Sequence, residues 1–437
     1  MKKSFAILLA LALLGQLCAC GQLSKLKNVE LPPLPTVTER PAEEAPAPEA
    51  PEETAPAEEP APMPDTAAQT PVIVGFRETR MEDYDPAEGE QKILTFSYVT
   101  PLVTIPGREE AAKAINEYIA MLDETFYTGN DYGDGPSDGY YGMLEQAEDN
   151  FTYAFETGTD LPLEFSCERF ADVYRVDEAV LCLALSTSSY TGGAHGFYAT
   201  RCYNFDTQSG EILTLEQITP DYEAFKAFLV RRMVEMTESD PDLQAAMEGF
   251  VPAEEREERF GALPRDGSWY LDAKGLSVFS DLYELASYAA GVQTFSFSYE
   301  ELGDLLDARW RPAETIGAGS LKLLPLTDQA DPLTVLDTLT LSEEGTSLYL
   351  YGDGAVYDLR LNRAGQSEYL EGYYRGEPLW YASCLQDAAL LLKTELPDGA
   401  PELALSYRGA DGAQHGFLLT QSGEDGRLSL QETDFAA

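Results

Sequence analysis

A stretch rich in Pro, Ala and Glu, from Asn28 to about Pro71, limits where this 437-residue chain can begin to fold. The stretch contains no aromatic residue and too few large apolar ones to bury a core. Its prolines favour the extended polyproline II conformation, so it is expected to act as a stalk. The folded part of the chain is therefore expected to start near Val72.

The N-terminus has the pattern of a lipoprotein signal peptide. Two lysines precede the apolar stretch Phe5–Leu14, which is shorter than the roughly 20 residues needed to span a bilayer as a helix. The run that follows, Leu17-Cys18-Ala19-Cys20, resembles the lipobox of bacterial lipoproteins. We expect a signal peptide over residues 1–19, with palmitate-type acyl chains on Cys20 holding the protein on the extracytoplasmic side of the cell membrane. Residues 20–71 would then be the anchor and the disordered stalk. Ordinary cleavage, with both cysteines incidental, is the alternative.

The chain is strongly acidic, with a formal net charge of −47. Five basic and ten acidic residues precede Val72, so the region from Val72 onward keeps 24 basic and 66 acidic residues. This charge disfavours nucleic acid and anionic membrane surfaces as partners and favours a cationic one. The alternative is that the acidity serves only solubility. Contact with the membrane is expected through the lipid anchor alone.

Four cysteines remain beyond the anchor, namely Cys167, Cys182, Cys202 and Cys384. Export permits disulfides, but pairing cannot be deduced from one sequence, so structural thiols and a single bridge both stay open. No CxxC pair and no Cys/His metal spacing occurs. No cofactor and no metal are expected.

The region from Val72 to Arg311 alternates strand and helix patterns. The clearest helix is 109–127, in which Ile115, Ile119, Leu122 and Phe126 recur at helical spacing. A Gly/Asp-rich stretch, 129–142, is expected to end it. The other expected elements are strands at 92–104, 163–174, 179–190, 197–205, 269–271 and 294–297, and helices at 221–236 and 299–306. This order predicts an α+β module over residues 72–311, with an antiparallel sheet and helices packed on one face.

The residue pattern changes after Pro312, and no convincing helix pattern follows. Short strand candidates are divided by Gly, Asp and Asn turns, at 347–351, 356–361, 389–392, 403–407 and 417–419. This pattern predicts an all-β C-terminal domain over residues 318–437, a meander that closes into a small sandwich or barrel.

The most distinctive run is Tyr190-Thr191-Gly192-Gly193-Ala194-His195-Gly196. Gly192 and Gly193 permit backbone angles closed to other residues, and Gly196 lets the chain re-enter the sheet without a side-chain clash. His195 is thereby presented at a turn. Three roles are open to it, namely bonding backbone carbonyls to lock the loop, contacting a ligand, and acting in catalysis or metal binding.

Together with the later run Leu282–Gly291, LYELASYAAG, this segment resembles the extracytoplasmic module shared by the lysozyme-sensing anti-sigma factor RsiV and the peptidoglycan deacetylase PdaC. The resemblance covers roughly Lys92 to Arg311. It implies a domain of unknown function that, in the sensor, binds lysozyme, a cationic protein. Individual lysozyme contacts do not transfer to this chain. The ligand-binding candidates are the motif residues themselves: Tyr190, Gly192, Gly193, His195, Gly196 and Tyr283.

The resemblance does not extend to deacetylase chemistry. That activity resides in a separate domain whose metal site needs an Asp and two closely spaced histidines, and His195 and His415 are the only histidines here. We therefore expect a non-catalytic cell-envelope lipoprotein, with no catalytic residue, that binds a cationic protein such as lysozyme or a cell-wall component. The alternatives are a peptidoglycan-acting enzyme using unassigned carboxylates and a structural lipoprotein of a membrane complex.

Overall fold

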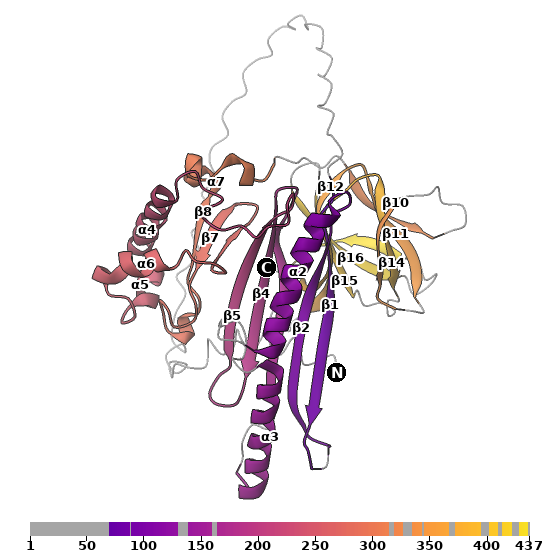
Figure 1. The fold of residues 1–437 in the computed structure, drawn as a ribbon. Coiled ribbons are helices and arrows are strands. Elements are labelled where there is room, and N and C mark those ends of the chain that lie inside the picture. Colours follow the sequence, from indigo (N-terminus) through magenta and orange to yellow (C-terminus); the bar gives the residue numbers. More distant parts are fainter. Residues whose placement is uncertain are drawn as a thin grey trace, which may run out of the picture.

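A ten-stranded sheet runs through the protein and joins its N-terminal and C-terminal halves (Figure 1). The computed structural model describes residues 70–87, 89–129, 139–159, 164–313, 319–326, 334–342, 345–366, 372–394, 402–409, 413–421 and 428–435. Cys20, the stalk and the Asp/Gly-rich run 130–138 lie outside these residues. Within the described ranges, no helix is long and apolar enough to cross a membrane.

The strand order of this sheet is β17-β16-β15-β12-β13-β1-β2-β3-β4-β5. Its N-terminal strands are β1 (Ile73–Tyr84), β2 (Lys92–Thr104), β3 (Phe165–Val176), β4 (Val180–Tyr190) and β5 (Phe197–Asp206). Its C-terminal strands are β12 (Val356–Gln366), β13 (Tyr373–Leu385), β15 (Leu403–Arg408), β16 (Gln414–Gln421) and β17 (Leu428–Glu432). The halves meet where β1 pairs with β13, over Ile73 to Gly75.

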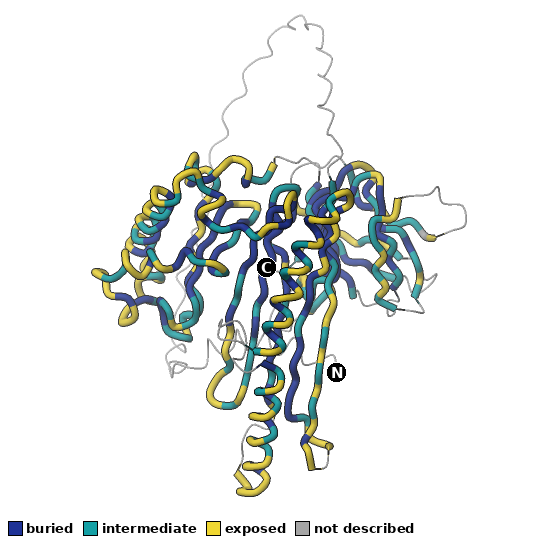
Figure 2. Tube along the Cα trace, viewed as in Figure 1, coloured by how far each residue is buried: buried dark blue, intermediate teal, exposed yellow. Residues whose placement is uncertain are grey.

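One pairing in this sheet is parallel, that of β2 with β3. The crossover between them carries α2 (Glu109–Thr128) and α3 (Gly139–Thr157), as a parallel connection requires. Ile115, Ile119 and Leu122 of α2 are buried against β1 to β5. The outward side of α2 and much of α3 stay exposed (Figure 2).

The opposite face of β4 and β5 supports a second layer. It contains the three-stranded sheet β6 (Trp269–Leu271), β7 (Gly275–Phe279) and β8 (Thr294–Ser298). Its helices are α4 (Tyr222–Ser239), α5 (Pro241–Met247), α6 (Arg256–Ala262) and α7 (Tyr299–Leu302), with 3-10 turns at Ala253–Glu255, Tyr288–Ala290, Gly303–Leu305 and Ala308–Trp310. Because side chains alternate along a strand, Val180 and Cys182 enter this core while Leu181 and Leu183 face α2.

The C-terminal half is a two-sheet sandwich. A four-stranded sheet, in the order β10-β14-β11-β9, packs on the C-terminal strands of the large sheet. Its strands are β9 (Ser320–Pro325), β10 (Thr334–Thr340), β11 (Thr346–Asp353) and β14 (Ala388–Thr394). Leu350 and Leu390 from this sheet share a core with Leu361 and Trp380 from the other.

The predicted fold class is confirmed: an antiparallel-rich sheet with helices is followed by an all-β C-terminal region. The structure adds that the helices lie on both faces of the large sheet and that the C-terminal strands extend that same sheet. Strands β1, β7, β9, β10, β13 and β17 and helices α3, α5 and α6 were not predicted from the sequence.

Candidate functional site

The glycine-rich run forms the turn between β4 and β5. Gly192 and Gly193 have φ values of 91° and 95°, in the region that favours glycine. A Cβ on Gly196 would lie 2.6 Å from the carbonyl oxygen of Ser189, so this position requires glycine. The Tyr190 hydroxyl donates to the Gly193 carbonyl at 3.2 Å. The predicted conformational roles of the three glycines are therefore confirmed, and Tyr190 stabilises the turn from within.

His195 projects from this turn and meets the second motif. Its Nδ1 lies 2.9 Å from the Gly196 carbonyl oxygen, and its Nε2 lies 3.3 Å from the Tyr283 hydroxyl. The imidazole also stacks on Tyr288, with ring centroids 3.9 Å apart and planes 21° apart. Since a carbonyl can only accept, Nδ1 donates to Gly196, whereas in the second contact either Nε2 or the Tyr283 hydroxyl can be the donor. Two motifs distant in sequence thus form one contact.

The surface around this contact is aromatic and exposed. Tyr283 is 51% exposed. Phe197 and Tyr198 at the start of β5 are also exposed, but as consecutive strand residues they point to opposite faces of the sheet and do not share one surface. His195 is exposed as well. Exposed aromatic groups close together mark surfaces that bind partners more often than isolated ones do. We name the three rings that contact one another, those of His195, Tyr283 and Tyr288, the aromatic surface.

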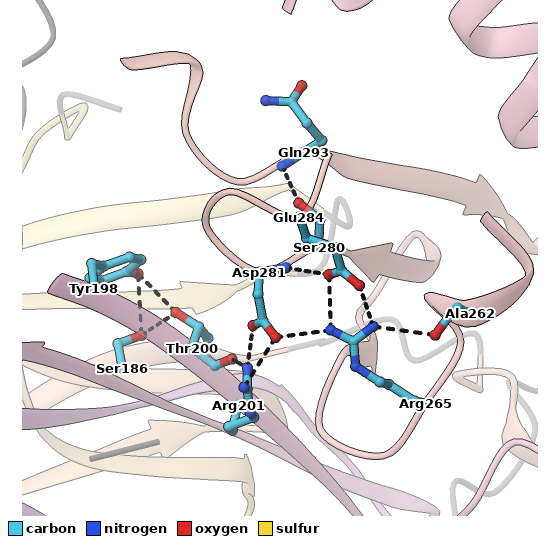
Figure 3. Close-up of polar contacts among 10 residues, drawn as sticks. All are labelled: Ser186, Tyr198, Thr200, Arg201, Ala262, Arg265, Ser280, Asp281, Glu284 and Gln293. Carbon is cyan, nitrogen blue, oxygen red and sulfur yellow. Dashed lines mark hydrogen bonds and ion pairs between the residues drawn. The ribbon is translucent and has the colours of Figure 1, made fainter. Parts of the chain in front are cut away.

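Three hydroxyl groups on β4 and β5 form hydrogen bonds with one another (Figure 3). Ser186 Oγ is 2.9 Å from Thr200 Oγ1, and Thr200 donates to the Tyr198 hydroxyl at 2.9 Å. These contacts hold Tyr198 on the strand surface, with hydroxyl groups beside its exposed ring. Rings with adjacent hydroxyl groups suit recognition of either a protein or a sugar.

An ion-pair network, here called the arginine clamp, fixes the second motif against β5 (Figure 3). Arg201 Nη1 lies 2.6 Å from Asp281 Oδ1, and Arg265 Nη2 lies 2.9 Å from Asp281 Oδ2. Arg265 also holds both carboxylate oxygens of Glu284, at 2.8 and 2.9 Å. Burial alone would raise the pKa of Asp281, but hydrogen bonds and charges from Arg201 and Arg265 outweigh it and lower that pKa.

Tyr283 lies between the two carboxylates of the arginine clamp and has a strained backbone. Its φ is 65°, a left-handed value that a bulky side chain rarely adopts. Such strain costs on the order of 1–3 kcal/mol and persists only where the surroundings impose it. Here Asp281 N donates to Glu284 Oε2 at 2.8 Å, and Leu285 is fully buried in the core. The clamp therefore holds the exposed Tyr283 ring in place.

The four residues of the clamp were not singled out as site residues from the sequence. Glu284 lies within the second motif, but Arg201, Arg265 and Asp281 are far apart in the chain, and nothing in their spacing connects them. His415, the other histidine, lies on β16 near the opposite edge of the ten-stranded sheet from β5. The two histidines therefore do not form a pair. Within the described parts of the chain, no group of three or more His, Cys, Asp or Glu side chains is placed to hold a metal ion.

All four cysteines beyond the predicted anchor are buried and are thiols rather than disulfides. Burial raises the pKa of Cys167 to about 12 and that of Cys384 to about 11. The pKa of Cys202 is raised as well, mainly by burial and secondly by its neighbour Cys182. Burial therefore favours the protonated form of Cys167, Cys202 and Cys384, and all four cysteines serve as core side chains.

Residues 218–300 match the family model described as a protein of unknown function (DUF3298), so a domain of this type is present there. This region contains α4 to α6, β6 to β8 and Tyr283, whereas His195 lies outside it. The chain is similar to the crystal structure of a DUF3298 family member from Bacteroides fragilis, with a TM-score of 0.42 and 17% identity over 55% of this chain and 96% of that chain. It is also similar to a DUF3298 family protein from Pseudomonas aeruginosa, with a TM-score of 0.37 and 17% identity over 55% of this chain and 97% of that chain. No curated protein matches the chain.

Proposed function

We propose that this protein is a non-catalytic lipoprotein of the cell envelope, anchored through Cys20, whose RsiV-like module binds an extracellular protein or wall ligand. The observation that carries the proposal is the meeting of the two motifs, His195 from one and Tyr283 from the other, on an exposed aromatic surface. The resemblance of these motifs to the extracytoplasmic module of RsiV and PdaC makes a lysozyme-like cationic hydrolase the named example.

The physical properties of the aromatic surface support a binding role. Tyr283 and His195 are fixed by the arginine clamp and by ring stacking, so little side-chain freedom would be lost when a partner docks. Rigid aromatic side chains at the centre of an interface commonly supply most of its binding energy. The excess of acidic residues from Val72 onward would steer a cationic partner toward the module.

Calorimetry between the full mature chain and purified lysozyme at moderate salt tests this proposal. Truncating a rigid tyrosine in an interface centre costs about 2 kcal/mol, so Tyr283→Ala should weaken binding roughly 30-fold. His195→Ala should weaken it as well, since it removes the ring against which Tyr288 and Tyr283 are held. Tyr153→Ala is the matched control, because Tyr153 is 57% exposed on α3 and outside the aromatic surface.

Two outcomes count against specific parts of the proposal. Binding no stronger than that of an equally acidic control protein removes lysozyme as the ligand. Equal losses of affinity from Tyr283→Ala and Tyr153→Ala would indicate nonspecific adhesion. They would refute the aromatic surface as the binding site. Pull-down of wall fragments with the same three variants then tests the wall-ligand form of the proposal separately.

A further inference from the structure

A cavity of about 320 Å³ lies where the N-terminal module meets the C-terminal strands, apart from the aromatic surface. Its wall is formed by the turn between β3 and β4, the segment 309–313, and parts of β12, β13 and β15. Five arginines line it: Arg175, Arg309, Arg311, Arg360 and Arg408. They are five of the 24 basic residues that follow the stalk, gathered in one place in a chain dominated by acids.

The carboxylates in the cavity wall do not balance these arginines. Asp177, Glu178 and Asp358 line it, and Asp206 behind the wall pairs with Arg309 at 2.5 Å, which leaves a formal excess of one positive charge. Asp358 is shared, since its carboxylate lies 2.9 Å from Arg360 and 3.9 Å from Arg408. A set of arginines kept only for structural ion pairs would be expected to have one carboxylate each.

Arg175 Nε lies 2.5 Å from Asp177 Oδ2, and neutral acceptors take up other arginine donors. Arg175 Nη1 donates to the Trp310 carbonyl at 2.6 Å and to the Tyr299 hydroxyl at 2.9 Å. Arg360 Nη1 donates to the Val173 carbonyl at 3.0 Å, and Arg311 Nη2 donates to a backbone carbonyl in the same way. These neutral acceptors fix the guanidinium groups and add no negative charge to the cavity. The cavity is therefore a prearranged cationic site.

Two of these arginines also keep unused donors. Arg175 is 4% exposed, and its Nη2 has no hydrogen-bond partner among the described residues. The Nε of Arg311 is also buried and has no hydrogen-bond partner among the described residues. A buried N–H group without a partner is costly, and an oxyanion is the acceptor that a guanidinium binds best.

We propose that this cavity binds a phosphate group. A phosphate monoester offers three strong acceptor oxygens and a carboxylate offers two, so a phosphate can accept from more of the arginine donors around the cavity. The volume suits a small group rather than a large ligand. A phosphate held there would contact the β3–β4 turn, the 309–313 segment and the C-terminal strands together. Its binding would therefore tie the two halves of the protein to each other.

Titration calorimetry of the full mature chain with inorganic phosphate, at constant ionic strength in chloride, tests the proposal. We expect saturable binding that acetate does not reproduce. Arg408→Ala and Arg309→Ala, whose side chains are 28% and 54% exposed, should fold and should each weaken binding about tenfold, the loss for one charge-assisted hydrogen bond. Arg231→Ala is the control, since Arg231 is 64% exposed on α4 and its substitution should change nothing.

A second arm distinguishes the source of the phosphate. Glycerol 3-phosphate binding more tightly than the free ion indicates a phosphate ester of a larger molecule, and the reverse order indicates the free ion. Absence of saturable phosphate binding overturns the proposal. Binding that Arg408→Ala and Arg309→Ala leave at the wild-type level overturns it equally.

Discussion

The substitution Asp281→Asn tests whether the arginine clamp stabilises the module by charge. Asp281 is the carboxylate that Arg201 and Arg265 share, at 2.6 and 2.9 Å, and its side chain is 34% exposed. Fully buried, each charge-assisted hydrogen bond would contribute about 1.5–3 kcal/mol. Solvent screening at this exposure reduces each to about 1 kcal/mol, so the substitution should cost about 2 kcal/mol at pH 7.

Acid should remove this difference. The pKa of Asp281 in the folded protein is lowered, because Arg201 and Arg265 outweigh the opposing effect of burial. The carboxylate therefore stabilises the fold fully above its unfolded pKa of about 3.9, and this contribution disappears as pH falls through the lower, folded value. Wild type and Asp281→Asn should thus differ at pH 7, begin to converge below about pH 4, and become equal only below the folded pKa of Asp281.

Urea unfolding followed by tryptophan fluorescence measures this difference, because Trp269 and Trp310 lie in the core that Leu285 joins. Asp149→Asn is the control, since it removes an exposed charge of α3 and corrects for the relief of general acidic repulsion. Equal stability of wild type and Asp281→Asn at pH 7 would refute the charge contribution. A difference that stays constant down to pH 3 would also refute it, since asparagine cannot titrate.

Three further outcomes are expected. Gly196→Ala should lower the thermal unfolding midpoint, because its Cβ would meet the Ser189 carbonyl, whereas Gly75→Ala has nothing within 4 Å and should be nearly neutral. The four buried thiols, Cys202 among them, should resist a thiol reagent in the native protein and react in denaturant; fast native labelling would contradict their burial. Cys20→Ala should move the protein from the membrane to the soluble fraction, and retention without a second anchor would remove the lipoprotein assignment.

The local elements were predictable where side-chain periodicity alone decides the structure. Ile115 and Ile119 belong to a regular apolar stripe, and the helix they predict exists as α2. Helix α3 carries a weaker signal, because its buried positions are mainly small residues such as Ala147 and Ala154 and it begins at a glycine. Strand β1 was missed because its outer half reads as charged sequence, although it pairs with β2 along its length.

Long-range contacts were not predictable from one sequence. The pairing of Ile73 with Ala382 joins segments about 300 residues apart, and no local pattern in either strand specifies its partner. The arginine clamp could not be predicted for the same reason, since Arg201 and Asp281 meet only after β5 and the second layer have packed. The glycine turn was predictable because backbone freedom at Gly193 is a property of the residue itself. His195 was placed correctly at the turn, but its contact with Tyr283 required the fold.

The distribution of charge separates the two proposed sites physically. Exposed carboxylates would attract a cationic protein from a distance. At physiological ionic strength, salt screens this attraction beyond about 8 Å. The arginines of the cavity are different, since Arg175 and Arg360 are largely withdrawn from water and act on a group in direct contact. Capture of a cationic partner should therefore weaken steeply with salt, whereas phosphate binding should weaken less. The aromatic surface and the cavity share no residue. When a substitution abolishes binding at one site, binding at the other can therefore show that the variant is still folded.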